Sequence, residues 1–117
     1  MIRPLLLCLV LAPLPVSAQE AISRAAGDLR VLDKVTGQLT DLPISVGQAE
    51  TVGTLTITMN DCRVPADNPE GDAFAELLVT HRDDPTPVFS GWMIASAPAL
   101  NAMDHPRYDV WVMDCNT

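Results

Sequence analysis

The fold class is decided by Val-Gly-Thr-Leu-Thr-Ile-Thr-Met at residues 52–59, where apolar and polar side chains alternate with a period of two. Leu55, Ile57 and Met59 share one parity, and threonines occupy the other. Successive side chains of a strand point to opposite faces, so this pattern predicts a strand with one buried face. Threonine also suits the half-buried, pleated surface of a sheet.

Strand-like periodicity continues on both sides of that stretch. Further strands are expected at residues 29–35, 42–46, 74–82, 88–95 and 108–115. Pro43 has no backbone N–H to donate, which places its strand at the edge of a sheet. The segment 108–115 carries apolar residues at both parities, which predicts a central strand covered on both faces.

About six strands with short turns and no long helix predict an all-β domain, either a small antiparallel β-sandwich or a partly closed barrel. A short helical turn is expected at 98–103, before the last strand, because Pro98 lies near its start. Residues 19–28 are expected to form an N-terminal arm or a short helix, since their apolar residues have helix-like spacing and end at a glycine. The domain itself then spans residues 29–117.

The N-terminus follows the pattern of a cleavable signal peptide at residues 1–18. A basic start at Arg3 precedes the apolar run Leu5 to Ala12, and small residues end at Ala18, where we expect cleavage. The run is shorter than the roughly 20 apolar residues of a membrane span, so the processed chain is expected to have none. The alternative is an uncleaved amphipathic or buried helix, which the order of basic, apolar and small residues disfavours.

The composition excludes several classes of partner. The full chain has a net charge of −8, and removing Arg3 with the signal peptide leaves 6 basic and 15 acidic residues, a net charge of −9. Nucleic acids and anionic lipid surfaces both require a basic face, so neither is an expected partner. The acidity indicates either a solvated surface or a basic protein partner.

After processing, 117 − 18 = 99 residues remain, with two cysteines, Cys62 and Cys115. An even number of cysteines in an exported chain predicts a disulfide, and only one intramolecular pairing exists. Free buried thiols are the alternative, whereas a redox-active pair would need a C-x-x-C motif that the sequence lacks. Because each cysteine follows an apolar strand segment, the bond is expected to join two strand ends and to fix the C-terminus.

Candidate binding residues are concentrated in the C-terminal third of the chain. They are Trp92, Asp104, His105, Tyr108, Asp109 and Trp111. A carboxylate beside an imidazole permits acid–base chemistry, but no nucleophile accompanies the pair, and Ser90 lacks a G-x-S-x-G context. The competing interpretation is that His105 and Asp109 bond to loop backbone and fix the entry into the last strand.

The residue types of the chain also raise the possibility of two metal sites and an aromatic platform. Soft ligands for copper are present at Met93, Met103, His105 and Met113, although methionines at core parity are ordinary packing. The acidic loop 67–72 has calcium-like composition without the ordered ligand spacing of a calcium loop. The two tryptophans are expected to fill the core rather than form a ligand platform, because aromatic residues are only 4% of the chain. No cofactor is predicted.

Several blocks of sequence carry a family resemblance. These blocks are Leu32–Gly37, Gly53–Leu55 before Cys62, Phe89–Met93, Ser96–Leu100 and His105–Trp111 before Cys115. The order of these blocks resembles a family of small exported alphaproteobacterial proteins, the domain of unknown function 2155. The resemblance implies a periplasmic protein and agrees with a disulfide, but it implies no activity, substrate or catalytic residue. Genes of the family often neighbour one for an accessory subunit of the respiratory NADH dehydrogenase.

Three functional hypotheses follow. The first is a non-catalytic periplasmic module that binds or supports another envelope protein, with the edge near Pro43 as one place for a partner strand. The second is an enzyme that uses Asp104, His105 and Asp109. The third is a copper-binding protein built on the methionines and His105.

Overall fold

A computed structural model of the chain describes Pro4 and residues 20–117. The expected signal peptide, apart from Pro4, and its cleavage site lie outside these described residues. No helix in the described part of the chain is long and apolar enough to cross a membrane.

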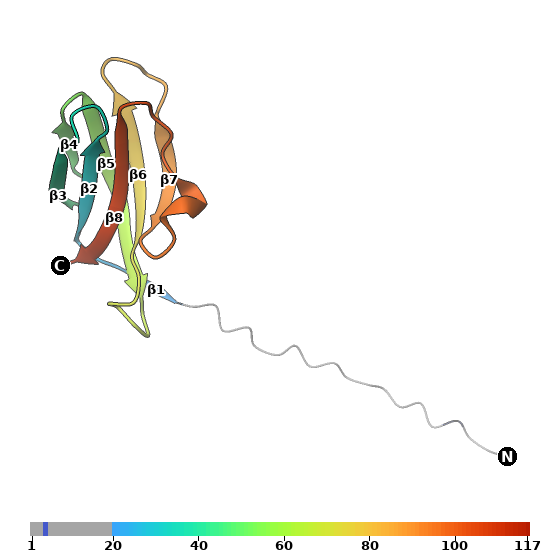
Figure 1. The fold of residues 1–117 in the computed structure, drawn as a ribbon. Helices are drawn as coiled ribbons and strands as arrows, with labels where there is room; N and C mark the ends of the chain where they lie inside the picture. The colour runs from blue at the N-terminus through green and yellow to red at the C-terminus, as the bar shows by residue number, and fades with distance from the viewer. Residues whose placement is uncertain (1–3, 5–19) are drawn as a thin grey trace.

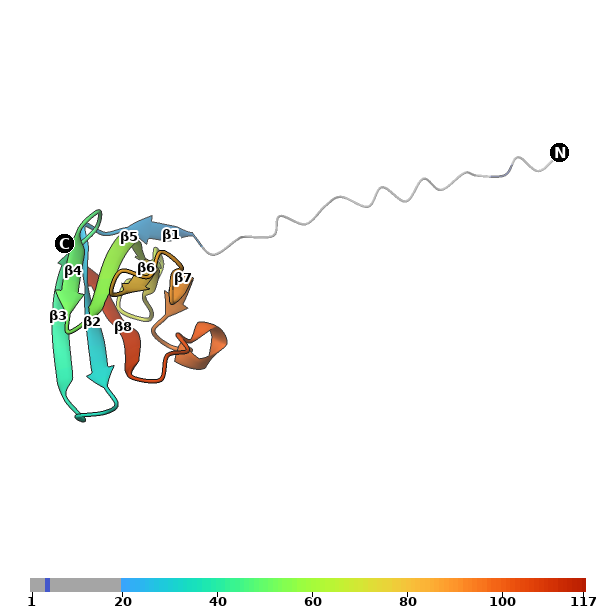
Figure 2. The ribbon, with the colours of Figure 1, turned by 90° about the horizontal axis from the view of Figure 1, so that it is seen from above.

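The described residues form two antiparallel sheets that pack face to face (Figures 1 and 2). The larger sheet contains β1 (Ala21–Ser23), β4 (Ala49–Val52), β5 (Leu55–Pro65), β6 (Phe74–His81) and β7 (Phe89–Ile94). Its order is β1-β5-β6-β7, and β4 also pairs with β5. The smaller sheet contains β3 (Leu39–Ser45), β2 (Ala26–Asp33) and β8 (Tyr108–Asn116), in the order β3-β2-β8.

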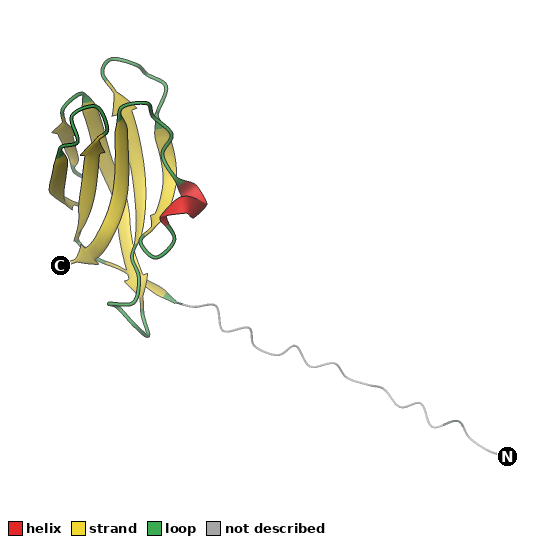
Figure 3. Cartoon of the chain, viewed as in Figure 1, coloured by secondary structure: helices red, strands yellow, loops and turns green. Residues whose placement is uncertain are grey.

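The predicted all-β class is confirmed, and the sheets form a sandwich that does not close into a barrel. Pro43 lies in the edge strand β3, as expected. A short 3-10 helix at Pro98–Asn101 precedes β8, which confirms the expected helical turn (Figure 3).

The core lies between the two sheets and follows the alternation seen in the sequence. Leu55, Ile57 and Met59 are fully buried and point inward from β5. Their partners across the core include Leu29 and Val31 of β2, which are also buried. No charged or polar side chain is fully buried in the described chain, so the inner layer is held together by apolar burial.

The observed strands differ in detail from the expected ones. The described residues contain eight strands, because β1 and β4 are additional and Gly53-Thr54 forms a turn between β4 and β5. Residues 20–28 form neither a helix nor a free arm, since β1 pairs with the end of β5 and β2 begins at Ala26. Alanine-rich periodicity over so few residues is overridden by the backbone hydrogen bonds that β5 offers.

The last strand is also not central. β8 pairs only with β2 and forms one edge of the smaller sheet. Tyr108, Val110 and Val112 face the core, whereas Trp111 is half-buried and Met113 is 44% exposed. Apolar residues at the second parity of β8 therefore lie on an outer face rather than beneath another layer.

Candidate functional site

A polar cluster bridges the two sheets at one end of the sandwich. We call it the histidine cluster and define it as Thr54, His81, His105 and Tyr108. His81 ends β6 of the larger sheet, and Tyr108 begins β8 of the smaller sheet. The ring centroids of His81 and His105 are 4.7 Å apart, and His105 stacks on Tyr108 at 5.7 Å. His81 and Thr54 were not singled out from the sequence, because only the pairing of β5 with β6 brings them to this loop.

Hydrogen bonds from Thr54 hold the buried end of the cluster. The Thr54 backbone N–H and hydroxyl both donate to the Tyr108 hydroxyl at 3.2 Å, and the Thr54 hydroxyl lies 2.7 Å from His81 Nε2. Donation by the Thr54 side chain and backbone lowers the pKa of Tyr108.

His105 organises the loop that enters β8. Its Nδ1 accepts hydrogen bonds from the backbone N–H groups of Arg107 and Tyr108, at 3.1 and 3.2 Å. An accepting Nδ1 must be unprotonated, so the neutral ring carries its proton on Nε2. Burial, and then the nearby His81 and Lys34, lower the pKa of His105, while Asp104 opposes the shift. These hydrogen bonds agree with the interpretation that His105 bonds to the loop backbone and fixes the entry into the last strand.

Basic side chains at this end are already engaged within the chain. Arg107 donates to Asp33 Oδ2 from Nη2 at 3.0 Å and lies over the Tyr108 ring at 5.1 Å. This ion pair lowers the pKa of Asp33. Lys34 Nζ donates to the His105 carbonyl at 2.6 Å. A neighbouring pocket of about 200 Å³ is lined by Asp33, Arg107 and Tyr108, among others.

The carboxylates of the enzyme hypothesis do not join this cluster. Asp109 follows the inward-facing Tyr108 and therefore projects to the outer face of β8, where its Oδ1 accepts from the Val110 N–H. Ser90 is exposed on β7. Among the described residues, no side-chain hydrogen bond links Ser90 with Asp104, His105 or Asp109.

The four potential copper ligands do not all meet at one site, because Met113 lies away from the histidine cluster along β8. Met93 and Met103 are buried in the core, with 4% and 6% of their surfaces exposed. Met113 lies five residues beyond the start of β8, which is roughly 16 Å along a strand from the histidine cluster. In the part of the chain that the structure describes, no group of three or more His, Cys, Asp and Glu side chains is placed to hold a metal ion.

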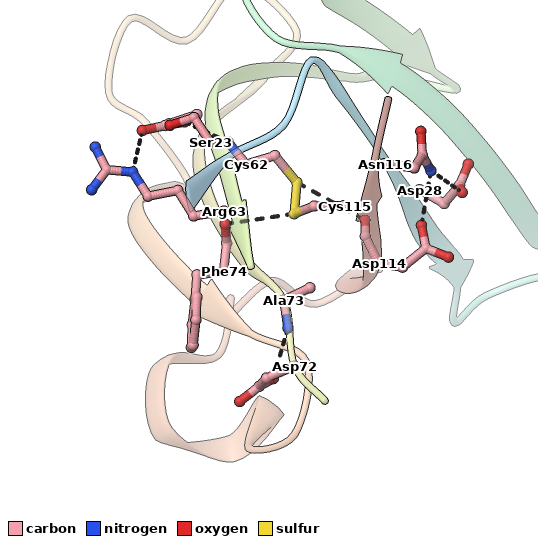
Figure 4. The surroundings of a disulfide bond; sticks show 11 residues. Ser23, Asp28, Cys62, Arg63, Asp72, Ala73, Phe74, Asp114, Cys115 and Asn116 are labelled. Atoms are coloured by element: carbon pink, nitrogen blue, oxygen red, sulfur yellow. Dashed lines mark hydrogen bonds and ion pairs between the residues drawn. A yellow bond between two sulfur atoms is a disulfide. The ribbon is translucent and has the colours of Figure 1, made fainter. Parts of the chain in front are cut away.

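The predicted disulfide lies at the opposite end of the sandwich (Figure 4). Cys62 of β5 and Cys115 of β8 are bonded, with their Cα atoms 5.6 Å apart, so the bond joins the larger sheet to the smaller sheet. Cys62 is fully buried. This confirms the expected pairing of two strands, although Cys62 lies inside β5 rather than after its end.

A groove of about 550 Å³ runs beside the disulfide. It is lined by Pro69, Glu70, Gly71, Asp72, Ala95, Ser96, Met113, Asp114, Cys115 and Asn116. Asp72 belongs to the acidic loop. Its carboxylate accepts hydrogen bonds from the backbone N–H groups of Ala73 and Ser96 and from the Ser96 hydroxyl. This carboxylate joins the loop between β5 and β6 to the turn that follows β7.

The two tryptophans lie outside the core, contrary to the expectation that they fill it. Trp92 is half-buried on the outer face of the larger sheet, where it contributes to a shallow apolar pocket with Ala21, Phe74 and Ile94. The Arg63 guanidinium lies over the Trp92 ring, 5.3 Å from its centroid. Trp111 is half-buried on the outer face of the smaller sheet. Their strands pair in different sheets, so the tryptophans form no common platform.

Fold and site together define a small antiparallel β-sandwich closed by one disulfide between its sheets. Residues 27–115 match the family described as "uncharacterized protein conserved in bacteria" (DUF2155), and the chain belongs to this family. The resemblance recognised in the sequence is therefore confirmed. The matched region contains both bonded cysteines, the histidine cluster and Trp111.

The chain is also similar to an uncharacterised protein of Rickettsia prowazekii (strain Madrid E), with 27% identity over 92 residues. That match covers 76% of this chain and 59% of the relative, so this chain spans less than two thirds of the relative's length. No solved structure matches the chain.

Proposed function

We propose that this chain is a non-catalytic module of the periplasm that binds another envelope protein through the outer faces of its sheets. The observation that carries the proposal is the position of the tryptophans. The chain has only two, and both lie on outer sheet faces instead of in the core. Tryptophan, together with arginine, is enriched among residues that dominate binding energy at protein interfaces.

The residues around each tryptophan strengthen this interpretation. Trp92 is flanked by Phe74 and Ile94 on the larger sheet. On the smaller sheet, which carries Trp111, Leu39 is 58% exposed and Met113 is 44% exposed. Exposed apolar groups gathered on a sheet face are typical of interaction surfaces, whereas isolated ones are ordinary.

Export is the second part of the proposal. The basic, apolar and small residues of segment 1–18 support cleavage after Ala18, and a disulfide persists in an oxidising compartment. Intact-mass measurement of protein isolated from the periplasm should give a chain that begins at Gln19, with its two cysteines oxidised. Recovery of a chain that still carries Met1 would contradict export by this route.

The binding proposal is tested by affinity capture from the cell envelope with matched variants. Trp92→Leu and Trp111→Leu each remove one outer-face aromatic, and Leu100→Ser replaces an apolar residue of the short 3-10 helix that is 75% exposed. We expect the wild type and Leu100→Ser to recover the same envelope protein, and at least one tryptophan variant to lose it. The accessory subunit of the respiratory NADH dehydrogenase implied by gene neighbourhood is the first partner to look for. Equal recovery with all variants would refute binding through these faces.

A further inference from the structure

The outer face of the smaller sheet has a chemistry that the other outer face lacks. The register of β3, β2 and β8 places two kinds of side chain on this face. The apolar ones are Leu32, Leu39, Pro43, Trp111 and Met113. The charged ones are Asp28, Arg30, Asp41, Asp109 and Asp114. We call this surface the Trp111 face. The register places Trp111 beside Arg30, and Asp28 beside Asp114. In the described chain no other element pairs or packs on this side of the sheet.

The charges on this face are unbalanced. Arg30 is its single basic residue and forms an ion pair with Asp41, at 2.9 Å between Nε and Oδ1. No described basic side chain forms an ion pair with Asp28, Asp109 or Asp114. Asn116 donates to both Asp28 and Asp114, but it adds no positive charge. A hydrogen bond with Asp114, and then burial, raise the pKa of Asp28, as expected for crowded carboxyl groups.

Trp92, on the other outer face, differs from Trp111 because a cation of the same chain lies over its ring. The ring of Trp92 is covered within the chain by the guanidinium of Arg63, which also pairs with Asp61 at 2.6 Å. Trp111 has an arginine beside it in the register, but that guanidinium is turned to Asp41. No described cation lies over the Trp111 ring. Trp111 therefore combines a partly exposed ring, over which no described cation lies, with flanking carboxylates.

We propose that the Trp111 face binds a partner polypeptide through an arginine or lysine side chain that stacks on Trp111 between Asp109 and Asp114. A cation over an indole ring is stabilised by the ring quadrupole, and nearby carboxylates add charge complementarity. Leu32, Leu39 and Met113 supply apolar contact for residues that flank the cation. The inference rests on the proposed function and names the surface and the chemistry of the partner.

The test uses the two indole N–H signals in an NMR titration of the ¹⁵N-labelled protein, because each tryptophan reports one sheet face. Three matched probes are blocked hexapeptides that alternate valine with arginine, with citrulline, or with glutamate. We expect saturable shifts at the Trp111 indole with the arginine peptide alone. Asp109→Asn and Asp114→Asn keep the acceptor oxygens, remove charge and should together weaken binding about fivefold. Trp111→Leu should abolish saturable binding, whereas Trp92→Leu should leave the affinity unchanged.

Equal shifts at both indoles, or binding of the citrulline peptide with the same affinity, would overturn the proposal. Concentration-dependent self-association that buries Trp111 in the free protein would do so as well, since a second copy would then be the occupant. Unchanged thermal unfolding of each variant is the folding control. If capture from the envelope is lost only in Trp92→Leu, this inference fails while the proposed function stands.

Discussion

Replacing Cys62 and Cys115 together with alanine should remove a large share of the domain's stability. The cysteines are 53 residues apart and close a loop of 53 + 1 = 54 residues. In the chain-entropy model, a loop of this length contributes about 4 kcal/mol by restricting the unfolded chain. For a domain of about 100 residues this corresponds to a melting temperature lower by roughly 15–30 °C.

The structure explains why the loss is not offset elsewhere. In the described chain the bond is the single disulfide between the two sheets, which otherwise meet through their connecting loops, apolar packing and the hydrogen bonds between Thr54 and Tyr108. Cys62 is fully buried, so its truncation to alanine also leaves a small void in the core. These contributions act in the same direction.

Urea unfolding monitored by tryptophan fluorescence measures the effect. We expect the midpoint of the oxidised wild type to exceed that of the double variant by about 2 M, given a typical dependence on urea near 2 kcal/mol/M. Reductant should lower the wild-type midpoint toward that of the variant and leave the variant unchanged. A wild type whose midpoint is indifferent to reductant, or equal to that of the variant, would refute the reasoning.

Three further predictions concern packing, hydrogen bonding and pH. Gly27→Ala should destabilise the fold by roughly 1–3 kcal/mol, since an added Cβ would lie 2.7 Å from the Cys62 sulfur. Gly37→Ala is the control, because Gly37 has a φ of +76° and no atom near an added Cβ, so that only backbone strain changes there. Tyr108→Phe should cost about 1–3 kcal/mol in chemical denaturation, because the Thr54 N–H loses its acceptor. The pKa of His105 is lowered from 6.5 in the folded state. As pH falls below 6.5, the unfolded chain therefore binds more protons than the folded chain. The contribution of His105 to stability is complete above pH 6.5 and is lost as pH falls through the lowered pKa of the folded state. His105→Gln should flatten this part of the stability profile, and an unchanged profile would contradict the assignment.

Much of the fold was predictable because the core is built from strands with one buried face. Leu55, Ile57 and Met59 are buried as their alternation predicts, and the missing N–H of Pro43 placed its strand at an edge. The disulfide was predictable because the sequence leads one to expect an exported chain with two cysteines, which allow a single pairing. The buried parity and the edge position depend on local chemistry, whereas the disulfide depends on the number of cysteines.

The histidine cluster could be predicted only in part. His105 and Tyr108 were identified because they are close in sequence, whereas His81 and Thr54 come from separate strands. Their contacts depend on the antiparallel register in which His81 pairs with Leu55. The alternation of β6 places His81 on the same face as the buried Leu77 and Val79, but no local signal in the sequence identifies β5 as the strand that brings Thr54 beside it.

What the sequence by itself determined is the class of fold, the strand periodicity, the bonded cysteines and the family. Only the tertiary structure decided that β8 is an edge strand and that Trp92 and Trp111 lie on opposite outer faces. Apolar residues at both parities satisfy a central strand and an interaction surface equally well. The difference depends on whether another layer of the same chain covers the second face, which is a property of how the sheets pack and not of the strand itself.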